Sequence, residues 1–171
     1  MARLALPLRS QRLELRAYRP EDVPAVYAVL YGDEQARRLT GGVSTLAETR
    51  AVVERYIELQ DRLGYSFWPV IERATGELIG EAGLKPFEGG GSEAEIGYAF
   101  GPPWWGRGYA TEAGRAIVDA ALGPLGLHRL VGVTDDRNVG SQRVFDRLGF
   151  AFEGHRQVYG RAMRFYVLDR R

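Results

Sequence analysis

Cysteine is absent from the 171-residue chain, and histidine occurs only twice, as His128 and His155. The lack of cysteine excludes disulfide bonds, thiolate metal sites and a cysteine nucleophile. Two histidines without a recognisable ligand spacing also make a poor zinc site, because such sites combine several His and Cys side chains at short intervals. We therefore expect no metal cofactor.

A charge excess and a long apolar run are also missing. The formal net charge is +1, so the strong basic excess typical of nucleic-acid-binding proteins is not present. No run approaches the ~18 apolar residues of a membrane span. The N-terminal segment MARLALPLRS lacks the apolar core of a signal peptide. We expect a cytoplasmic protein with neither nucleic-acid nor membrane partners.

The spacing of apolar residues predicts the order of the secondary-structure elements. Strands are expected at 12–18, 65–73, 77–87, 93–101, 129–134, 150–159 and 162–169. Helices are expected from about 21 to 30, over 45–64, after Gly108 and over 138–149. Turns between neighbouring strands are expected at 74–76 and 89–92.

This order, β α α β β β α β α β β, mixes hairpins with βαβ crossovers. It predicts an α/β fold of mixed α+β character, with about six to seven strands in one sheet and about four helices covering both faces. No internal repeat or linker interrupts the chain, so residues 1–171 are expected to form a single domain.

The stretch WWGRGYATEA, residues 104–113, joins an expected strand to an expected helix. Its glycines let backbone N–H groups approach a ligand, and a helix N-terminus carries unpaired N–H groups with partial positive charge. The stretch predicts an anion-binding turn, with a tight packing turn as the alternative. A P-loop is excluded because Arg107 and Gly108 stand where Lys and a hydroxyl residue are required. A dinucleotide fingerprint is excluded because Thr111 replaces the third glycine.

The same stretch resembles the acyl-CoA loop of the GCN5-related N-acetyltransferases (GNAT family), whose signature is Gln/Arg-x-x-Gly-x-Gly/Ala. Trp105 stands at the Gln/Arg position, and Gly108 and Ala110 stand at the two small positions. Tryptophan followed by Thr-Glu-Ala is similar to the branch that acetylates ribosomal-protein N-termini, the RimJ/RimL type. The segments RLELR, EIGYAF (95–100) and NVGSQRVFDRLGF (138–150) resemble further family segments in family order.

The resemblance implies acetyl-CoA as cosubstrate and direct transfer of the acetyl group to a primary amine, without an acyl-enzyme. Backbone N–H groups from Gly106 to Thr111 would wrap the pyrophosphate. Arg107 would add charge, or would be an ordinary solvated arginine. Trp104 and Trp105 would wall the loop or the acyl channel. The residues implied to contact the cofactor are Tyr98, Ala99, Phe100, Trp105, Gly106, Arg107, Gly108, Tyr109, Ala110, Thr111, Asn138 and Ser141.

Many family members use as acid a tyrosine seven residues after the helix asparagine, and Phe145 occupies that position here. The resemblance therefore implies the Ser141 hydroxyl as the proton donor, although a serine at a helix start can also simply satisfy backbone groups. Asn138 is expected to cap this helix and to contact the pantetheine arm. Glu95 is the candidate general base, acting through water, with a surface charge as the alternative. Further candidates for the base are Tyr98, Tyr159 and His155.

A protein N-terminus is the first acceptor implied, and small amines such as amino acids, polyamines or aminoglycosides are the alternative. We expect the acceptor site within residues 20–64 and 152–166, where Asp33 and Glu34 could attract a cationic acceptor. A non-catalytic acetyl-CoA sensor is the rival function, and Phe145 is the departure that supports it. Members of this branch often pair, so a homodimer that uses the C-terminal strand RFYVLD is a further expectation.

Overall fold

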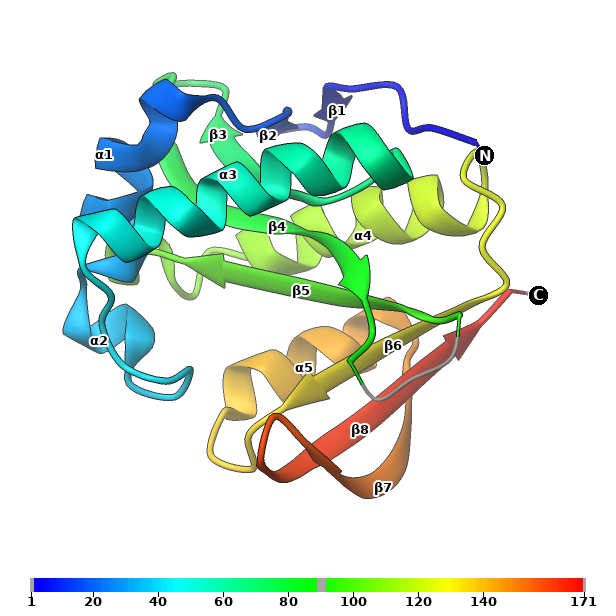
Figure 1. Ribbon diagram of the computed structural model, residues 1–171. Coiled ribbons are helices and arrows are strands. Elements are labelled where there is room, and N and C mark those ends of the chain that lie inside the picture. Colours follow the sequence, from blue (N-terminus) through cyan, green and yellow to red (C-terminus); the bar gives the residue numbers. More distant parts are fainter. Residues whose placement is uncertain (1, 89–91, 171) are drawn as a thin grey trace.

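The computed structural model describes residues 2–88 and 92–170, and its centre is one mixed sheet of eight strands (Figure 1). The strands follow one another across the sheet in the order β1-β2-β3-β4-β5-β6-β8-β7. Their bounds are β1 Leu8–Arg9, β2 Leu13–Leu15, β3 Phe67–Glu72, β4 Leu78–Pro86, β5 Ala94–Phe100, β6 Arg129–Thr134, β7 Ala151–Val158 and β8 Arg161–Asp169. The predicted mixed sheet is confirmed, with one more strand than expected, because β1 is too short to show an alternating pattern.

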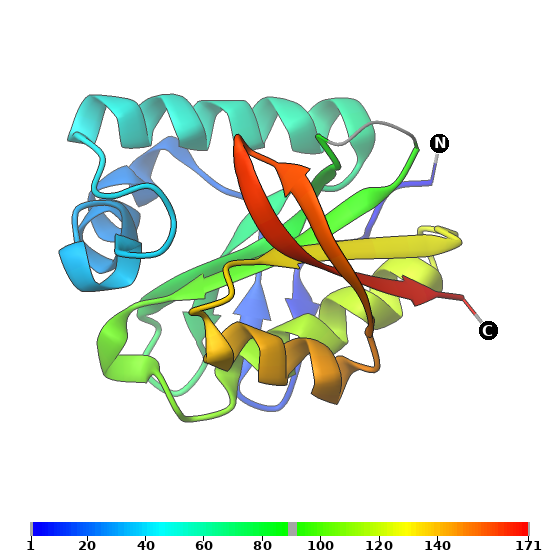
Figure 2. The ribbon, with the colours of Figure 1, turned by 90° about the horizontal axis from the view of Figure 1, so that it is seen from below.

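Helices cover both faces of the sheet, as the view from below shows (Figure 2). Within the described residues there are five α-helices: α1 Val23–Val26, α2 Glu34–Arg37, α3 Leu46–Leu63, α4 Tyr109–Leu122 and α5 Val139–Leu148. One apolar cluster joins α1 and α3 to the sheet around Val26 and Val53. A second cluster joins α4 and α5 to the opposite face around Ile117 and Val144.

The helix expected from about 21 to 30 is right in position and wrong in form. A 3-10 turn, η1 (Pro20–Asp22), leads into α1, and the segment ends in a π-helical turn, η2 (Tyr27–Tyr31). The short α2 follows and was not predicted, because four residues cannot show helical periodicity. For this reason the described chain has one more α-helix than the four expected.

Two other helices begin and end where the sequence predicts. Thr45 and Glu48 form a capping box at the start of α3, and Gly64 ends that helix at a φ of 75°. The side chain of Asn138 accepts a hydrogen bond from the Ser141 N–H at 3.1 Å, which confirms its predicted role as the cap of α5. Gly149 ends α5 in the left-handed conformation.

The central strands β5 and β6 pair at only two positions, Ala94 with Leu130 and Glu95 with Val131. Beyond these pairs the two strands separate, and Figure 1 shows their ribbons diverging. The backbone groups of β5 that face β6 along Gly97–Phe100 therefore have no partner in that strand. The sheet is open at this point, between two strands that are otherwise central to it.

The C-terminal strand RFYVLD, expected as a dimer contact, belongs to the core of the chain itself. Phe165 and Tyr166 are buried. Because β8 lies between β6 and β7, both of its edges are already paired. These aromatic side chains therefore provide no surface for a partner.

The hairpin turn expected at 74–76 joins β3 to β4 as predicted, whereas the turn expected at 89–92 falls largely outside the described residues. Across the parts of the chain that the structure describes, every helix is too short or too polar to span a membrane.

Phe145, which occupies the position of the family tyrosine, packs in the centre of the core. Its side chain is 1 % exposed, and its ring centroid lies 4.7 Å from that of Tyr166 and 5.2 Å from that of Phe150. Gly132 on β6 lies directly against this ring, so that an added Cβ would overlap it. The close approach of the strand to Phe145 therefore requires glycine.

The substitution Gly132→Ala should destabilise the fold, because overpacking would displace Phe145. We expect a loss of roughly 1–3 kcal/mol in the free energy of unfolding, measured by chemical denaturation. Gly140→Ala is the matched control, because its added Cβ would make only ordinary contact and alanine favours a helix. Equal stability of the two variants would contradict this account of the core.

Candidate active site

A cleft of about 590 Å³ lies where β5 and β6 separate. It runs from the N-terminal ends of α4 and α5, past the end of β5, to α2 and the segment that follows it. All the residues predicted to contact a cofactor line this cleft except Arg107. They are Tyr98, Ala99, Phe100, Trp105, Gly106, Gly108, Tyr109, Ala110, Thr111, Asn138 and Ser141. The separation of two strands thus brings three distant segments of the chain to one site.

Part of the cleft lining was not predicted from the sequence. The residues missed are Gln35, Ala36, Arg38, Leu39 and Thr40 beside α2, and Arg137, Val139, Gly140, Arg143, Val144 and Arg147 at α5. For Arg143 and Arg147, the spacing of four residues in an expected helix could have placed both on one face. No local signal marks the segment beside α2, since it reaches the cleft only through the fold.

The glycine-rich loop leaves backbone donors free at the start of α4. Gly106 and Gly108 have φ values of 73° and 79°, which other residues rarely adopt. The first hydrogen bond of the helix runs from Glu112 N–H to Gly108 C=O at 3.0 Å, so the N–H groups of residues 109–111 precede it. The buried Thr111 hydroxyl also has no hydrogen-bond partner among the described residues. These donors fit a ligand with phosphate oxygens.

Arg12 contacts the Gly106–Gly108 loop and the first residue of α4. Its guanidinium donates to the Arg107 carbonyl at 2.9 Å and lies 4.3 Å from the centre of the Tyr109 ring. Glu112 accepts hydrogen bonds from the Arg12 N–H at 2.7 Å and from the Ser10 hydroxyl at 2.6 Å. Burial alone would raise the pKa of Glu112, but these hydrogen bonds outweigh it and lower the pKa. The loop is therefore held in place before any ligand arrives.

Tyr98 and Ser141, both predicted as catalytic candidates, lie together in the middle of the cleft. The Ser141 hydroxyl donates to the Tyr98 hydroxyl at 3.2 Å, and the Tyr98 hydroxyl donates to the Ser141 carbonyl at 3.1 Å. Burial raises the pKa of Tyr98, so its hydroxyl keeps its proton at neutral pH. Tyr98 is therefore protonated in the cleft, where it both donates and accepts a hydrogen bond, and it does not act as a base.

Trp105 forms part of the cleft wall and is held there by a hydrogen bond. Its indole N–H donates to the Phe100 carbonyl at 2.7 Å, and its side chain remains 42 % exposed. This contact occupies one of the backbone acceptors at the open edge of β5. The neighbouring Trp104 also lines the cleft.

Glu95, the candidate base, lies on the opposite face of the sheet from Tyr98, because side chains alternate along a strand. It is buried, accepts a hydrogen bond from the Tyr159 hydroxyl and lies 3.7 Å from the Lys85 ammonium. Burial raises the pKa of Glu95 although Lys85 and Tyr159 oppose this effect. Glu95 does not line the cleft, but Ala99, two alternations further along the same face, does.

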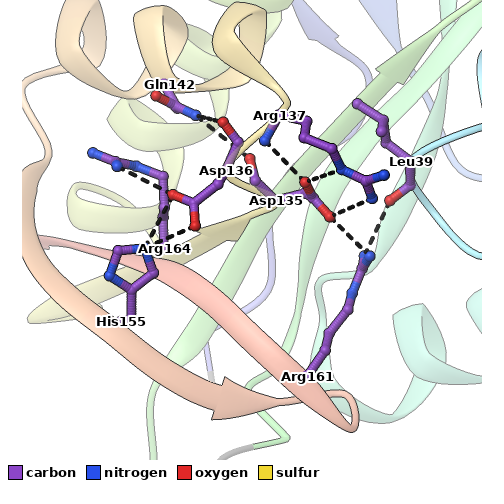
Figure 3. A network of polar contacts seen from close by, with 8 residues as sticks. All are labelled: Leu39, Asp135, Asp136, Arg137, Gln142, His155, Arg161 and Arg164. Carbon is purple, nitrogen blue, oxygen red and sulfur yellow. Dashed lines mark hydrogen bonds and ion pairs between the residues drawn. The ribbon is translucent and has the colours of Figure 1, made fainter.

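A polar network surrounds the end of β6, where Asp135 and Asp136 follow the strand (Figure 3). Asp135 pairs with Arg137 at 2.9 Å and with Arg161 at 3.0 Å, and the hydrogen bonds from Arg137 hold its pKa well below the usual range. Arg161 also donates to the Leu39 carbonyl at 3.0 Å. The network therefore joins the β7–β8 hairpin to the segment after α2 across the cleft entrance.

The remaining predicted candidates have other partners. His155 binds Asp136 at 3.0 Å in the same network (Figure 3) and does not line the cleft. The Asp33 carboxylate caps α2 by accepting a hydrogen bond from the Ala36 N–H at 2.7 Å. Neither Asp33 nor Glu34 lines the cleft. In residues 2–88 and 92–170, no group of three or more His, Cys, Asp or Glu side chains could hold a metal ion.

Comparisons with known proteins agree with this geometry. The sequence model of the family described as "Acetyltransferase (GNAT) domain" matches residues 12–151. The "Uncharacterized N-acetyltransferase YoaA" of Bacillus subtilis is 30% identical over 154 residues, which cover 89% of this chain and 86% of that protein. A GNAT-family acetyltransferase structure from Bacillus anthracis superposes with a TM-score of 0.84 at 24% identity, covering 96% of this chain and 99% of that one.

RimL, a ribosomal α-N-protein acetyltransferase solved in complex with coenzyme A, superposes with a TM-score of 0.79 at 22% identity. The superposition covers 96% of this chain and 98% of RimL. At this identity the likeness concerns the fold. The family match, by contrast, extends over most of the sequence, and on that ground the chain belongs to the GNAT family of N-acetyltransferases.

Proposed function

We propose that this chain transfers an acetyl group from acetyl-CoA directly to a primary amine. The observation that carries the proposal is the single cleft that connects the Gly106–Gly108 loop with the Tyr98–Ser141 pair and then with α2. Acetyl-CoA supplies the acetyl thioester: its carbonyl carbon forms a bond to the amine nitrogen while its bond to sulfur breaks. The residues of the chain bind the two substrates and handle two protons.

The loop end of the cleft would bind the pyrophosphate. Backbone N–H groups of residues 109–111 and the Thr111 hydroxyl are the free donors there. Arg143 and Arg147 line the same part of the cleft from α5 and would add positive charge. The Asn138 side chain, beside Ser141, would contact the pantetheine arm.

The open edge of β5 would bind the thioester. Backbone groups along Gly97–Phe100 have no partner in β6 and can donate to the thioester carbonyl, where negative charge develops during attack. The leaving sulfur would take its proton from the Ser141 hydroxyl, and the nitrogen of the tetrahedral intermediate, which loses its second proton as the amide forms, would restore it. Tyr98 accepts the hydrogen bond of the Ser141 hydroxyl and would hold that hydroxyl in position. The Tyr98–Ser141 pair would take the place of the family tyrosine, whose position Phe145 occupies here. A hydroxyl that can protonate the sulfur favours a catalytic protein over a sensor that only binds acetyl-CoA.

Glu95 would accept the proton that the ammonium of the acceptor loses. It is held by Tyr159 on the face of β5 toward which Ala99 also points, so a water between Glu95 and the amine would complete the path. A carboxylate with a raised pKa is a stronger base than an exposed one, which suits this role.

A protein N-terminus is the acceptor we propose first. RimL, which shares the fold, is a ribosomal L7/L12 α-N-protein acetyltransferase. Free thiol release with acetyl-CoA, measured against N-terminal peptides and small amines, tests both the reaction and this choice. If thiol is released with small amines and not with the peptides, the proposed acetyl transfer stands and the proposed acceptor is wrong.

The substitution Gly108→Val should abolish acetyl-CoA binding, because the side chain would fill the space that the pyrophosphate needs. We expect at least about a hundredfold loss of affinity, equivalent to losing several charge-assisted hydrogen bonds, measured by calorimetric titration. Gly76→Val is the matched control: its φ of 76° imposes the same backbone strain, but it lies in a hairpin turn outside the cleft. Acetyl-CoA affinity that survives in the Gly108 variant would remove the loop from the binding site.

The substitution Ser141→Ala should lower kcat far more than acetyl-CoA affinity. Loss of a positioned proton donor costs on the order of 10²-fold or more in rate, and thiol release under saturating substrates measures it. Tyr98→Phe should show a smaller effect of the same kind, since Tyr98 would act through Ser141. An unchanged kcat in both variants would exclude the hydroxyl pair from the mechanism.

The rate should depend on pH through Glu95. A base acts only when deprotonated, and burial raises the pKa of Glu95, so kcat/KM for the amine should fall with decreasing pH at a higher pH than an exposed glutamate would give. Glu95→Gln should lower kcat/KM by about 10²-fold and remove that acidic limb. A limb that persists unchanged in the variant would belong to another group.

A further inference from the structure

The lining of the cleft carries charge of one sign. Four arginines line it, and no aspartate or glutamate does so among the described residues. Arg143 and Arg147 lie on α5 at the phosphate end. The other two, Arg38 and Arg137, lie beside α2 and at the end of β6, and so approach the cleft from two different elements at the end where the acceptor would enter.

Arg137 forms an ion pair with Asp135, but this pairing leaves its guanidinium available to bind a ligand. It shares Asp135 with Arg161, so Asp135 keeps one guanidinium when the other turns away. Its side chain is 69% exposed, whereas Asp135 is 13% exposed. Figure 3 shows both guanidinium groups directed at the one carboxylate, with the Leu39 carbonyl beyond Arg161. A ligand carboxylate could therefore recruit Arg137 without leaving a buried charge unpaired.

Arg38 follows α2 and is exposed, and it makes no ion pair in the described part of the chain. The nearby Asp33 carboxylate is used to cap α2. The two arginines at this end of the cleft are thus opposed by one carboxylate, Asp135, which Arg161 also shares.

Two buried glutamates of the sheet, Glu81 and Glu95, do not add negative charge to the cleft lining. Glu81 accepts hydrogen bonds at 2.7 Å from both Tyr18 and Tyr31, and Glu95 is held by Tyr159 and Lys85. Both glutamates lie outside the cleft lining. At the end that the acceptor would enter, the lining thus contains two arginines and no carboxylate among the described residues, which favours anionic groups over polycations.

We propose that the preferred acceptor is an amine that also carries a carboxylate, and that Arg38 and Arg137 bind this carboxylate. The inference rests on the proposed function and names the class of its acceptor. Guanidinium groups suit the role because each presents a planar pair of donors to a carboxylate. Either a free amino acid or a peptide with Asp or Glu beside its N-terminus could supply this chemistry. Polyamines and aminoglycosides, which carry only positive charge, would be poor acceptors.

Matched acceptors test the proposal. One pair consists of C-terminally amidated peptides that differ only in Glu or Gln at the second position, and a second pair consists of a free amino acid and its amide. The acid should exceed its neutral partner by about tenfold or more in kcat/KM in at least one pair, and the ratio should shrink as salt is added. The pair that shows the preference identifies the source of the carboxylate. Spermidine is included as the polycation and should be the poorest acceptor.

Variants tie the preference to the arginines. Arg38→Glu should remove the preference or reverse it, and Arg137→Gln should reduce it, while acetyl-CoA affinity stays within about twofold of the parent. Arg50→Glu is the matched control, because this exposed arginine on α3 makes the same charge change outside the cleft. It should leave the preference intact.

The outcomes separate this inference from the proposed function. Thiol release at equal rates for both members of each pair, or a preference unaltered in the Arg38 and Arg137 variants, would overturn the inference and leave the transferase intact. If either variant fails to fold, the parent's preference and its salt dependence still decide the question. If none of the acceptors gives thiol release, both the inference and the proposed function are overturned.

Discussion

The separation of β5 from β6 creates the cleft and decides which residues can reach it. The two strands are paired at Ala94 and Glu95 and then diverge, so a central strand exposes backbone groups that a closed sheet would use internally. Unpaired backbone groups in a protein interior are costly, and they persist where a ligand or another group satisfies them. Trp105 already satisfies the Phe100 carbonyl through its indole N–H. The remaining groups form a polar edge between two helix N-termini, which is a suitable place for a carbonyl and an anion.

Long-range contacts then fix the pieces around this opening. Arg12, near the N-terminus, holds the Arg107 carbonyl across 95 residues, and Arg161, near the C-terminus, holds the Leu39 carbonyl across 122 residues. Each contact ties a loop at the cleft to a strand or hairpin of the sheet. Residues near the two ends of the chain therefore hold the two loops, at Arg107 and at Leu39, that border the cleft.

The sequence predicted what is local and missed what the fold assembles. The helices at 45–64 and 138–149 were predictable because their caps and apolar faces are local, as was the loop, whose glycines precede a helix directly. The first helix was mistaken in form because its apolar spacing does not distinguish α, 3-10 and π turns. Arg38 and Arg137 could not be paired from the sequence, because about a hundred residues separate them and only the open sheet brings both to the cleft.

The passage through the sheet also bears on the order of events in a reaction cycle. The proposed phosphate end of the cleft is lined by α4 and α5, which cover one face of the sheet (Figure 2), whereas the other end is lined by residues beside α2. Acetyl-CoA and an amine that enter from opposite ends would not block one another, so both can be bound at once. Each product can then leave by the end at which its parent substrate entered. Such an arrangement favours a ternary complex with sequential kinetics over alternating occupancy of one shared entrance.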